Sequence, residues 1–419
     1  MRDTPSRIGG AGHKEGRCGV TTSRFAVAAV LLVVFLTGPA SAGITLFSPS
    51  STSIASTGVL DMAEGSNGEI YFATDGGLSV FRDGWTTLRT STPLANGSLL
   101  SNHVLAVATD HRGFVWVGYP NGLQVLAGPE IITIQDQQFL KNLNINALYR
   151  SGDDMCVATG SAGVHRWRND TWHWFSPGGE EGLGAYDVRS FAEDPEIGSL
   201  YLSSVDNGVW VTHPGPDTLR FVRLLAPVTG DPAWFRLRAD PFGGIYLFNR
   251  STVLHHSFRE GFRPVPWASD LMTGEITLYD MAMARSGASW LATSNGIYGF
   301  AEGRETVHLT AFDGIGSNAV KHIFSDRKGR IWFATTDLVG YLSSIDAEGT
   351  PIPVHIVKTG GAVTSTPVLT PIPTDLPPPP TPMISVDVSP MQGVSPPGPL
   401  AGFFSDLSRW LDGLFGQKW

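Results

Sequence analysis

Charged side chains and cysteine are both scarce in this chain of 419 residues. Asp, Glu, Lys and Arg make up 16% of the residues, and the formal net charge is −9. An acidic chain without a basic block beyond its N-terminal segment repels a phosphate backbone, which excludes nucleic acid as a partner. Long apolar runs are also missing, because FAVAAVLLVVFL at residues 25–36 is shorter than the roughly 20 residues of a membrane-spanning helix.

That short apolar run has the features of a signal peptide. It follows five basic side chains, and Gly38-Pro39 breaks a helix just before the small residues Ala40-Ser41-Ala42. We therefore expect residues 1–42 to be a signal peptide that is cleaved after Ala42, and the mature protein to be exported as a periplasmic, outer-surface or secreted protein. The alternative is an uncleaved anchor that extends into GITLF at residues 43–47.

Cysteine is limited to Cys18 and Cys156. Cys18 leaves with the signal peptide, so the mature chain cannot form an intramolecular disulfide even in an oxidising compartment. Cys156 lies in the apolar stretch MCVA without a neighbouring His or cationic residue, which favours a buried packing thiol over a nucleophile.

Glycine, by contrast, is abundant, with 49 residues, and the chain contains a repeat. Segments of the form EIYFATDGGLSVF, FVWVGYPNGLQVL and IWFATTDLVGYL return seven times, with spacings of 40 to 45 residues between equivalent positions. The equivalent positions are Tyr71, Trp116, Cys156, Tyr201, Tyr246, Trp290 and Trp332. A period of this length is typical of β-propellers.

Each repeat predicts four antiparallel strands, A to D. Strand A is a Val-x-x-Val run, an Asp-x-x-Gly turn follows, and strand B is centred on the aromatic position. An Asn-Gly or Gly-Gly hairpin leads into strand C, and a short aromatic-rich run forms strand D. We therefore predict an all-β fold with a single seven-bladed β-propeller over residues 43–357.

A closed ring needs its two ends to pair, because a free edge strand exposes unpaired N–H and C=O groups. Residues 44–47 resemble a strand D without a blade of its own. We assign them as the outer strand of blade seven, with PVHIV at residues 353–357 as the competing candidate.

Two stretches carry a resemblance to a known family. HVLAVATDHRGFVWVGYPNGLQVL and FDGIGSNAVKHIFSDRKGRIWFATTDLVGYL resemble the two-component regulator propeller repeat. The resemblance covers about residues 44 to 345 and implies an extracytoplasmic, ligand-binding sensor domain. The sequence shows no kinase or phosphoacceptor module, so we expect a sensor-like propeller without its own kinase.

A proline-rich segment follows the repeats. Residues 358–400 predict a stiff, solvated linker, because a Pro-rich segment cannot build a core. Residues 401–419 predict a short amphipathic helix, which contacts either a membrane surface or a groove in a partner protein, or packs back onto the propeller. Its apolar face consists of Phe403, Phe404, Leu407, Trp410, Leu411, Leu414 and Phe415.

Enzymatic motifs are not apparent. The chain has no Cys-x-x-Cys, His-Glu-x-x-His, Gly-x-Ser-x-Gly or phosphate loop. Adjacent residues of a strand point to opposite faces, so His255 and His256 are expected to be surface residues rather than a metal pair. We assign no catalytic residue, cofactor or metal site, and expect a monomer that binds a glycan, peptide or protein. The alternative function is a propeller lyase or hydrolase that acts on an exported polymer.

Strand direction predicts the ligand face. The loop before strand A and the turn between strands B and C emerge on one side of a blade, whereas the Asp-x-x-Gly turns emerge on the other and use their polar groups on their own backbone. The first side therefore collects aromatic and hydrogen-bonding side chains that suit a polar ligand, although individual Asn and Asp residues can equally serve their turns. The predicted ligand-binding residues are Asp75, His103, Tyr119, Asn121, Tyr186, Asp206, Arg250, Tyr279, Asn295 and Asp337.

The signal peptide is testable on the exported protein. We expect mass spectrometry to find a mature N-terminus at Gly43, because the small residues before it fit a signal peptidase site. A mature chain that retains residues 25–36 would favour the uncleaved anchor.

Overall fold

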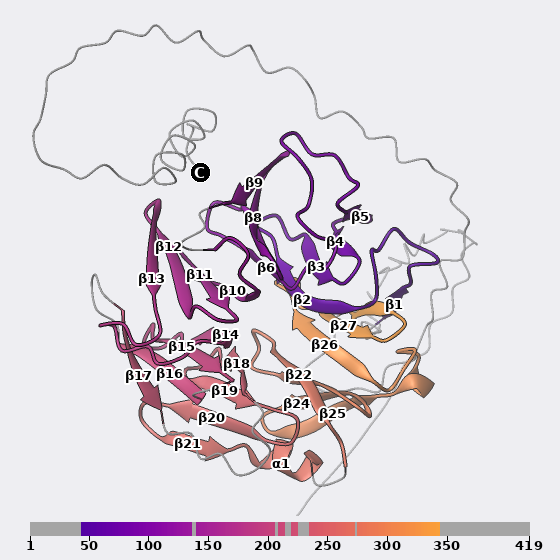
Figure 1. The fold of residues 1–419 in the computed structure, drawn as a ribbon. Coiled ribbons are helices and arrows are strands. Elements are labelled where there is room, and N and C mark those ends of the chain that lie inside the picture. Colours follow the sequence, from indigo (N-terminus) through magenta and orange to yellow (C-terminus); the bar gives the residue numbers. More distant parts are fainter. Residues whose placement is uncertain are drawn as a thin grey trace, which may run out of the picture. The chain divides into compact units, whose positions relative to one another are not determined.

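The computed structural model describes residues 43–135, 140–205, 208–213, 219–224, 234–272 and 275–343. These residues form seven antiparallel sheets of four strands each, which confirms the predicted seven-bladed β-propeller (Figure 1). The signal segment, residues 353–357, the Pro-rich linker and the C-terminal helix lie outside the described residues and stay predictions.

The first three blades follow one another along the chain. Blade 1 consists of β2 (Val59–Glu64), β3 (Ile70–Thr74), β4 (Gly77–Phe81) and β5 (Trp85–Leu88). Blade 2 consists of β6 (Ala106–Thr109), β7 (Val115–Tyr119), β8 (Gly122–Ala127) and β9 (Glu130–Ile134). Blade 3 consists of β10 (Ile145–Ser151), β11 (Asp154–Thr159), β12 (Val164–Arg168) and β13 (Thr171–Phe175).

The next three blades have the same strand order. Blade 4 consists of β14 (Val188–Glu193), β15 (Leu200–Ser204), β16 (Gly208–His213) and β17 (Arg220–Leu224). Blade 5 consists of β18 (Arg236–Ala239), β19 (Ile245–Phe248), β20 (Val253–Ser257) and β21 (Gly261–Pro264), and the short helix α1 (Pro266–Met272) connects it to blade 6. Blade 6 consists of β22 (Leu278–Met283), β23 (Ser289–Thr293), β24 (Gly296–Ala301) and β25 (Arg304–Leu309), followed by the 3₁₀ turn η1 (Ala311–Asp313).

Blade 7 joins the two ends of the ring. It consists of β26 (Val320–Ser325), β27 (Ile331–Thr335), β28 (Val339–Leu342) and, as its outer strand, β1 (Ile44–Phe47). β1 pairs antiparallel with β28, so that Ile44 lies opposite Leu342 and Phe47 opposite Val339. The assignment of residues 44–47 as the closing strand is therefore confirmed.

The hydrophobic core lies between blades rather than in one central mass. The buried apolar side chains form seven clusters, and each cluster joins one pair of neighbouring blades. Cys156, for example, is 1% exposed and packs between blades 3 and 4, so the predicted packing thiol is confirmed. Blade stacking explains why the inner strand residues are apolar on both faces, as in other sheets covered on both sides.

The Asp-x-x-Gly turns are held by one repeated bond network. In blade 7, Asp326 Oδ1 accepts the backbone N–H groups of Lys328 and Arg330, and Trp332 Nε1 donates to Asp326 Oδ2 at 2.9 Å. In blade 2, Trp116 Nε1 donates to Asp110 Oδ2 at 3.0 Å in the same way. The aspartate thus satisfies its own turn and orients the aromatic side chain of strand B, which is why these residue types recur at one offset.

The seven innermost strands form a closed circle. Each of β2, β6, β10, β14, β18, β22 and β26 contacts the next, and β26 contacts β2. These strands surround the central axis (Figure 1). Their inner edges have no further strand to pair with, so side chains and solvent must satisfy the backbone groups there.

Ring closure predicts one sensitive position. A Cβ atom at Gly340 would lie 2.6 Å from the Thr45 carbonyl oxygen and 2.8 Å from the Phe333 ring. We expect Gly340→Val to push β1 away from β28 and to lower the melting temperature by several degrees, because overpacking costs about 1–3 kcal/mol.

The matched control is Gly84→Ala, since a Cβ atom there meets nothing within 4 Å. Thermal unfolding of both variants and limited proteolysis of residues 43–53 provide the measurement. Equal melting temperatures and equal protection of that segment would contradict the role of β1 in closure.

Candidate binding cavity

A cavity of about 760 Å³ runs along the axis of the propeller. Its wall is built from the innermost strands of all seven blades and from the Asp-x-x-Gly turn residues of some of them. A volume between about 300 and 1,000 Å³ is typical of small-molecule sites. The geometry of the ring therefore creates one concave site to which every blade contributes.

The register of the inner strands decides which side chains reach this cavity. In five blades the pairing of the innermost strand with the next one shifts at its start, for example between Val59 and Asp61 and between Leu278 and Asp280. The residue after the shift is Asp61, Ala147, Ser190, Asp280 or His322. These equivalent positions form part of the cavity wall.

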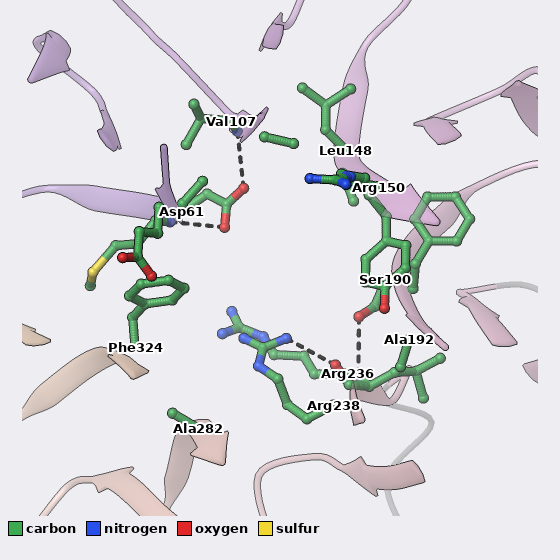
Figure 2. Close-up of a pocket in the computed structure, with 18 of the residues that line it drawn as sticks. Asp61, Val107, Leu148, Arg150, Ser190, Ala192, Arg236, Arg238, Ala282 and Phe324 are labelled. Atoms are coloured by element: carbon green, nitrogen blue, oxygen red, sulfur yellow. Dashed lines mark hydrogen bonds between the residues drawn. The ribbon is translucent and has the colours of Figure 1, made fainter. Parts of the chain in front are cut away.

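Three of these side chains bind the next blade. Asp61 accepts the Val107 N–H at 3.0 Å, Ser190 accepts the Leu237 N–H at 3.0 Å, and Asp280 accepts the Ile323 N–H at 3.3 Å. Figure 2 shows the first two of these bonds on opposite sides of the cavity. The inner edges are thus satisfied by side chains of the preceding blade, which links the blades around the axis.

Asp280 is the centre of an ionic cluster in the cavity wall. Its side chain is only 4% exposed, and Arg238 Nη2 donates to its Oδ1 at 2.7 Å. Arg236 Nη1 lies 3.6 Å from the same oxygen, and His322 Nδ1 lies 3.4 Å from Oδ2. Burial raises the pKa of Asp280, but the Arg238 charge and these other partners outweigh it and hold the pKa well below its usual range.

The two arginines of β18 have different roles. Arg238 also donates to the carbonyl oxygens of Met281 and Leu237, so it bridges blades 5 and 6. Arg236 forms its ion pair with Asp280 and lies over the Trp234 ring, and donates no hydrogen bond within the part of the chain that the structure describes. Arg236 therefore keeps donors for a ligand.

Asp61 faces the arginines across the cavity (Figure 2). Burial raises the pKa of its carboxyl to about 6, although the Val107 N–H, the Arg238 charge and the Met62 N–H act in the opposite direction. The carboxylate makes no ion pair within the described ranges. It is therefore a hydrogen-bond acceptor that a polar ligand can reach.

Apolar side chains complete the wall. Leu148, Ala192, Ala282 and Phe324 are labelled in Figure 2 between the charged groups, and all four line the cavity. Charged groups at a few positions in an otherwise apolar wall can orient a ligand while the apolar surface contributes to its burial.

The predicted ligand-binding residues lie elsewhere on the propeller. Asp75, His103, Asn121, Tyr186, Arg250 and Asp337 are exposed, Tyr279 and Asn295 are half-buried, Tyr119 is buried, and Asp206 lies outside the described residues. None of the nine described side chains lines the cavity. The contribution of the exposed ones to binding stays a prediction.

Two of these side chains are used inside their own blades. Tyr119 is fully buried in the apolar cluster between blades 1 and 2, and burial raises the pKa of its phenol. The Asn295 side-chain amide donates to the Tyr298 hydroxyl at 2.9 Å, and the backbone carbonyl oxygen of Asn295 lies 2.9 Å from His308 Nε2. Both placements fit a structural role.

His256 corrects the sequence analysis. It is not a surface residue but is 6% exposed between blades 4 and 5, where its Nδ1 lies 3.2 Å from the Tyr201 hydroxyl. His255 Nε2 instead lies 3.1 Å from Asp240 Oδ2, so the two rings do point to different partners. Blade stacking buries both faces of a middle strand, which the alternation argument did not take into account.

Sequence reasoning missed the charged residues of the innermost strands. A signal was present, because β18 (RLRA) and β22 (LYDM) carry charged residues where the equivalent strand β6 (AVAT) has none. The innermost strand of a blade has the axis along its free edge, so a charged side chain there can reach the cavity or a neighbouring inner strand. Among the described residues, no group of three His, Cys, Asp or Glu side chains is placed to hold a metal ion, and no helix is long and apolar enough to cross a membrane.

One repeat matches a known family. Residues 314–337 match the family described as the two-component regulator propeller. This segment contains β26 and β27 and ends before β28. It lies in one of the two stretches that carry the resemblance in sequence, so the resemblance is confirmed there. A comparison with curated protein sequences gave no significant match.

Solved structures share the fold at low sequence identity. The extracellular domain of a protein described as a one-component system of B. thetaiotaomicron has a TM-score of 0.57 and 15% identity, over 72% of this chain and 40% of that one. The extracellular domain of a protein described as a hybrid two-component system of the same organism has a TM-score of 0.58 and 16% identity, over 72% and 42%. Virginiamycin B lyase from Staphylococcus aureus has a TM-score of 0.54 and 13% identity, over 72% and 99%. The chain thus spans about two fifths of the length of these two extracellular domains, and the likeness shows the fold.

The ionic cluster predicts a pH-dependent loss of stability. Asp280→Asn removes the charge that Arg238 and Arg236 share, so we expect the free energy of unfolding to fall by about 3–5 kcal/mol at pH 7. The folded pKa of Asp280 lies below the unfolded value, so its contribution is complete above about pH 4 and is lost as the pH falls further.

Denaturant unfolding at pH 7 and at pH 3.5 measures this difference. Asp83→Asn is the control, because Asp83 is an exposed residue in the turn between β4 and β5. An Asp280→Asn cost no larger than that of the control at pH 7 would contradict a stabilising cluster.

Proposed function

We propose that this chain is an exported, sensor-like binding propeller that takes a polar ligand into its central cavity. The observation that carries the proposal is the cavity itself, whose wall combines arginine and carboxylate side chains with apolar ones. A site of this volume and composition suits a small glycan, a peptide or a projecting loop of a partner protein.

The family resemblance supports recognition rather than catalysis. The matched repeat is that of the two-component regulator propeller, and two of the similar structures are extracellular domains of proteins described as one-component and hybrid two-component systems. Export is supported by the signal-peptide pattern of residues 1–42 and by those extracellular neighbours. Residues 403–415 are the segment proposed to contact a membrane surface or a groove of a partner protein.

The lyase or hydrolase alternative has less support in the cavity. His322 and Asp280 form a close pair there, as in a general base with its orienting carboxylate. Asp280, however, already accepts the Ile323 and Met281 N–H groups and Arg238. The pair therefore serves the link between blades 6 and 7.

A cavity variant tests the proposed site. Leu60 lines the cavity and is 37% exposed, so Leu60→Trp narrows the axis without opening the core between blades. We expect this variant to weaken binding of any ligand found in a panel of oligosaccharides and peptides by at least about tenfold, because the ring occupies the space that the ligand needs.

The matched control is Val222→Trp, since Val222 is 43% exposed on the outer strand β17. Calorimetric titration of both variants provides the measurement, and Arg250→Ala, Tyr279→Ala and Asp337→Ala in the same assay test the predicted rim residues. Binding that Leu60→Trp leaves unchanged would place the ligand outside the cavity, and breakdown of a panel polymer would favour the lyase or hydrolase alternative.

A further inference from the structure

Arginines gather in the cavity wall of a protein that is acidic as a whole, with a formal net charge of −9. Five arginines contribute to the cavity wall: Arg150, Arg189, Arg236, Arg238 and Arg327. Two of them are neutralised locally, because Arg189 pairs with Asp187 at 2.6 Å and Arg327 Nε pairs with Glu64 at 3.0 Å. The other three are Arg150, Arg236 and Arg238.

Asp280 is the acidic partner of only two of these three. It receives Arg238 at 2.7 Å and Arg236 at 3.6 Å, so one carboxylate serves two guanidinium groups. Arg150 has no carboxylate partner within the described ranges, and its Nε donates to the Gly152 carbonyl oxygen at 2.9 Å. Asp61 and Asp110 are the remaining carboxylates of the wall, and Asp110 is used in its own turn, where it accepts the Arg112 and Phe114 N–H groups and the Trp116 Nε1 donor. What distinguishes the wall is therefore the donors that its arginines leave unused.

Two of these arginines keep free donors. Both Nη groups of Arg150 and the guanidinium of Arg236 donate no hydrogen bond to the described residues. Figure 2 shows these guanidinium groups directed into the cavity from different strands, Arg150 from β10 and Arg236 from β18. Arg238, by contrast, is held by Met281, Leu237 and Asp280 and is a supporting residue.

We propose that the cavity binds a ligand with a free carboxylate group, which Arg236 and Arg150 receive as hydrogen-bond donors. The planar fork of a guanidinium matches the two oxygens of a carboxylate, and such charge-assisted bonds are stronger than neutral ones. Phe324 and Leu148 provide apolar surface beside the arginines, and Asp61 provides an acceptor for a ligand hydroxyl or amide. The inference rests on the proposed binding function and adds the chemical class of the ligand.

Two sources of a carboxylate fit this description, a sugar acid and an acidic peptide. Calorimetric titration with glucuronate and with glucose compares ligands that differ in the acid group. The dipeptides Gly-Glu and Gly-Gln, both with an amidated C-terminus so that only the Glu side chain carries a carboxylate, form the second matched pair. We expect the acid of at least one pair to bind at least about tenfold more tightly than its neutral counterpart. Binding of glucuronate but not of Gly-Glu would identify the ligand as a sugar acid, and binding of Gly-Glu but not of glucuronate would identify it as an acidic peptide. Binding of both would show that the site recognises the carboxylate group alone.

Variants then test the two arginines. We expect Arg236→Gln and Arg150→Gln each to remove most of the preference for the acid, and Arg236→Lys to restore part of it because the charge returns without the fork. Arg304→Gln is the control, since Arg304 is exposed at the start of β25 and lies outside the cavity. Melting temperatures of the four variants establish that each one folds.

Three results would overturn the inference. The first is equal affinity for acid and neutral ligands, and the second is an acid preference that survives both glutamine variants. The third is binding of neutral oligosaccharides or peptides in the cavity, as judged by Leu60→Trp, without any binding of the acids. This third result would leave the proposed binding function intact, whereas no cavity-dependent binding of any probe would contradict both.

Discussion

A blade of this propeller cannot bury its own apolar surface. Each sheet has two faces, and each apolar cluster is shared by two neighbouring blades. A cluster therefore exists only if the next blade is present, and the last cluster, between blades 7 and 1, exists only if the ring closes. Closure depends on β1, whose Phe47 packs among Phe81, Trp85 and Trp332. Four residues thus complete both a sheet and the final stretch of core.

The same closed circle creates the site. Seven inner strands meet at the axis with unpaired edges, and the protein satisfies several of those edges with side chains such as Asp61 and Ser190 from the preceding blade. Polar side chains needed for closure are therefore already in the cavity. Further charged side chains of the same strands, above all Arg236 and Arg150, then become available for a ligand, so structural and binding groups share one wall.

The fold could be predicted because its signals are local. Asp326, Trp332 and the glycines of the hairpin turns determine the shape of each repeat within a few residues, and a period repeated seven times leaves few alternatives. Even the closing strand could be identified, because residues 44–47 look like a strand without a blade. The burial of His256 was missed because it depends on a neighbouring blade, and neighbouring blades come together only in three dimensions.

The candidate site was harder to predict for a physical reason. The sequence analysis placed the ligand-binding groups in loops, because loops vary more in sequence and are more exposed than the strands that they connect. Arg236, Arg238 and Asp280 instead lie in strands, and a single charged residue in an apolar strand does not reveal whether it faces solvent, an ion pair or an axis. Only the circular arrangement of β18, β22 and β26 shows that these charges meet.

The pairing of β1 with β28 has a consequence for the order of folding. The Gly43 and Ser343 backbones that flank this pair are bonded to each other across 300 residues of chain. The first strand to emerge during synthesis or export therefore waits for the last one, while the other six blades can each form from a continuous stretch of chain. Contacts between residues so far apart in the sequence slow folding, because the chain loses conformational entropy before the contact contributes any stabilising energy. Until then blade 7 keeps an open outer edge, and a second copy of residues 44–47 from another molecule fits that edge as well as the chain's own. A low protein concentration during refolding therefore favours the closed monomer, and a high protein concentration favours strand-exchanged assemblies.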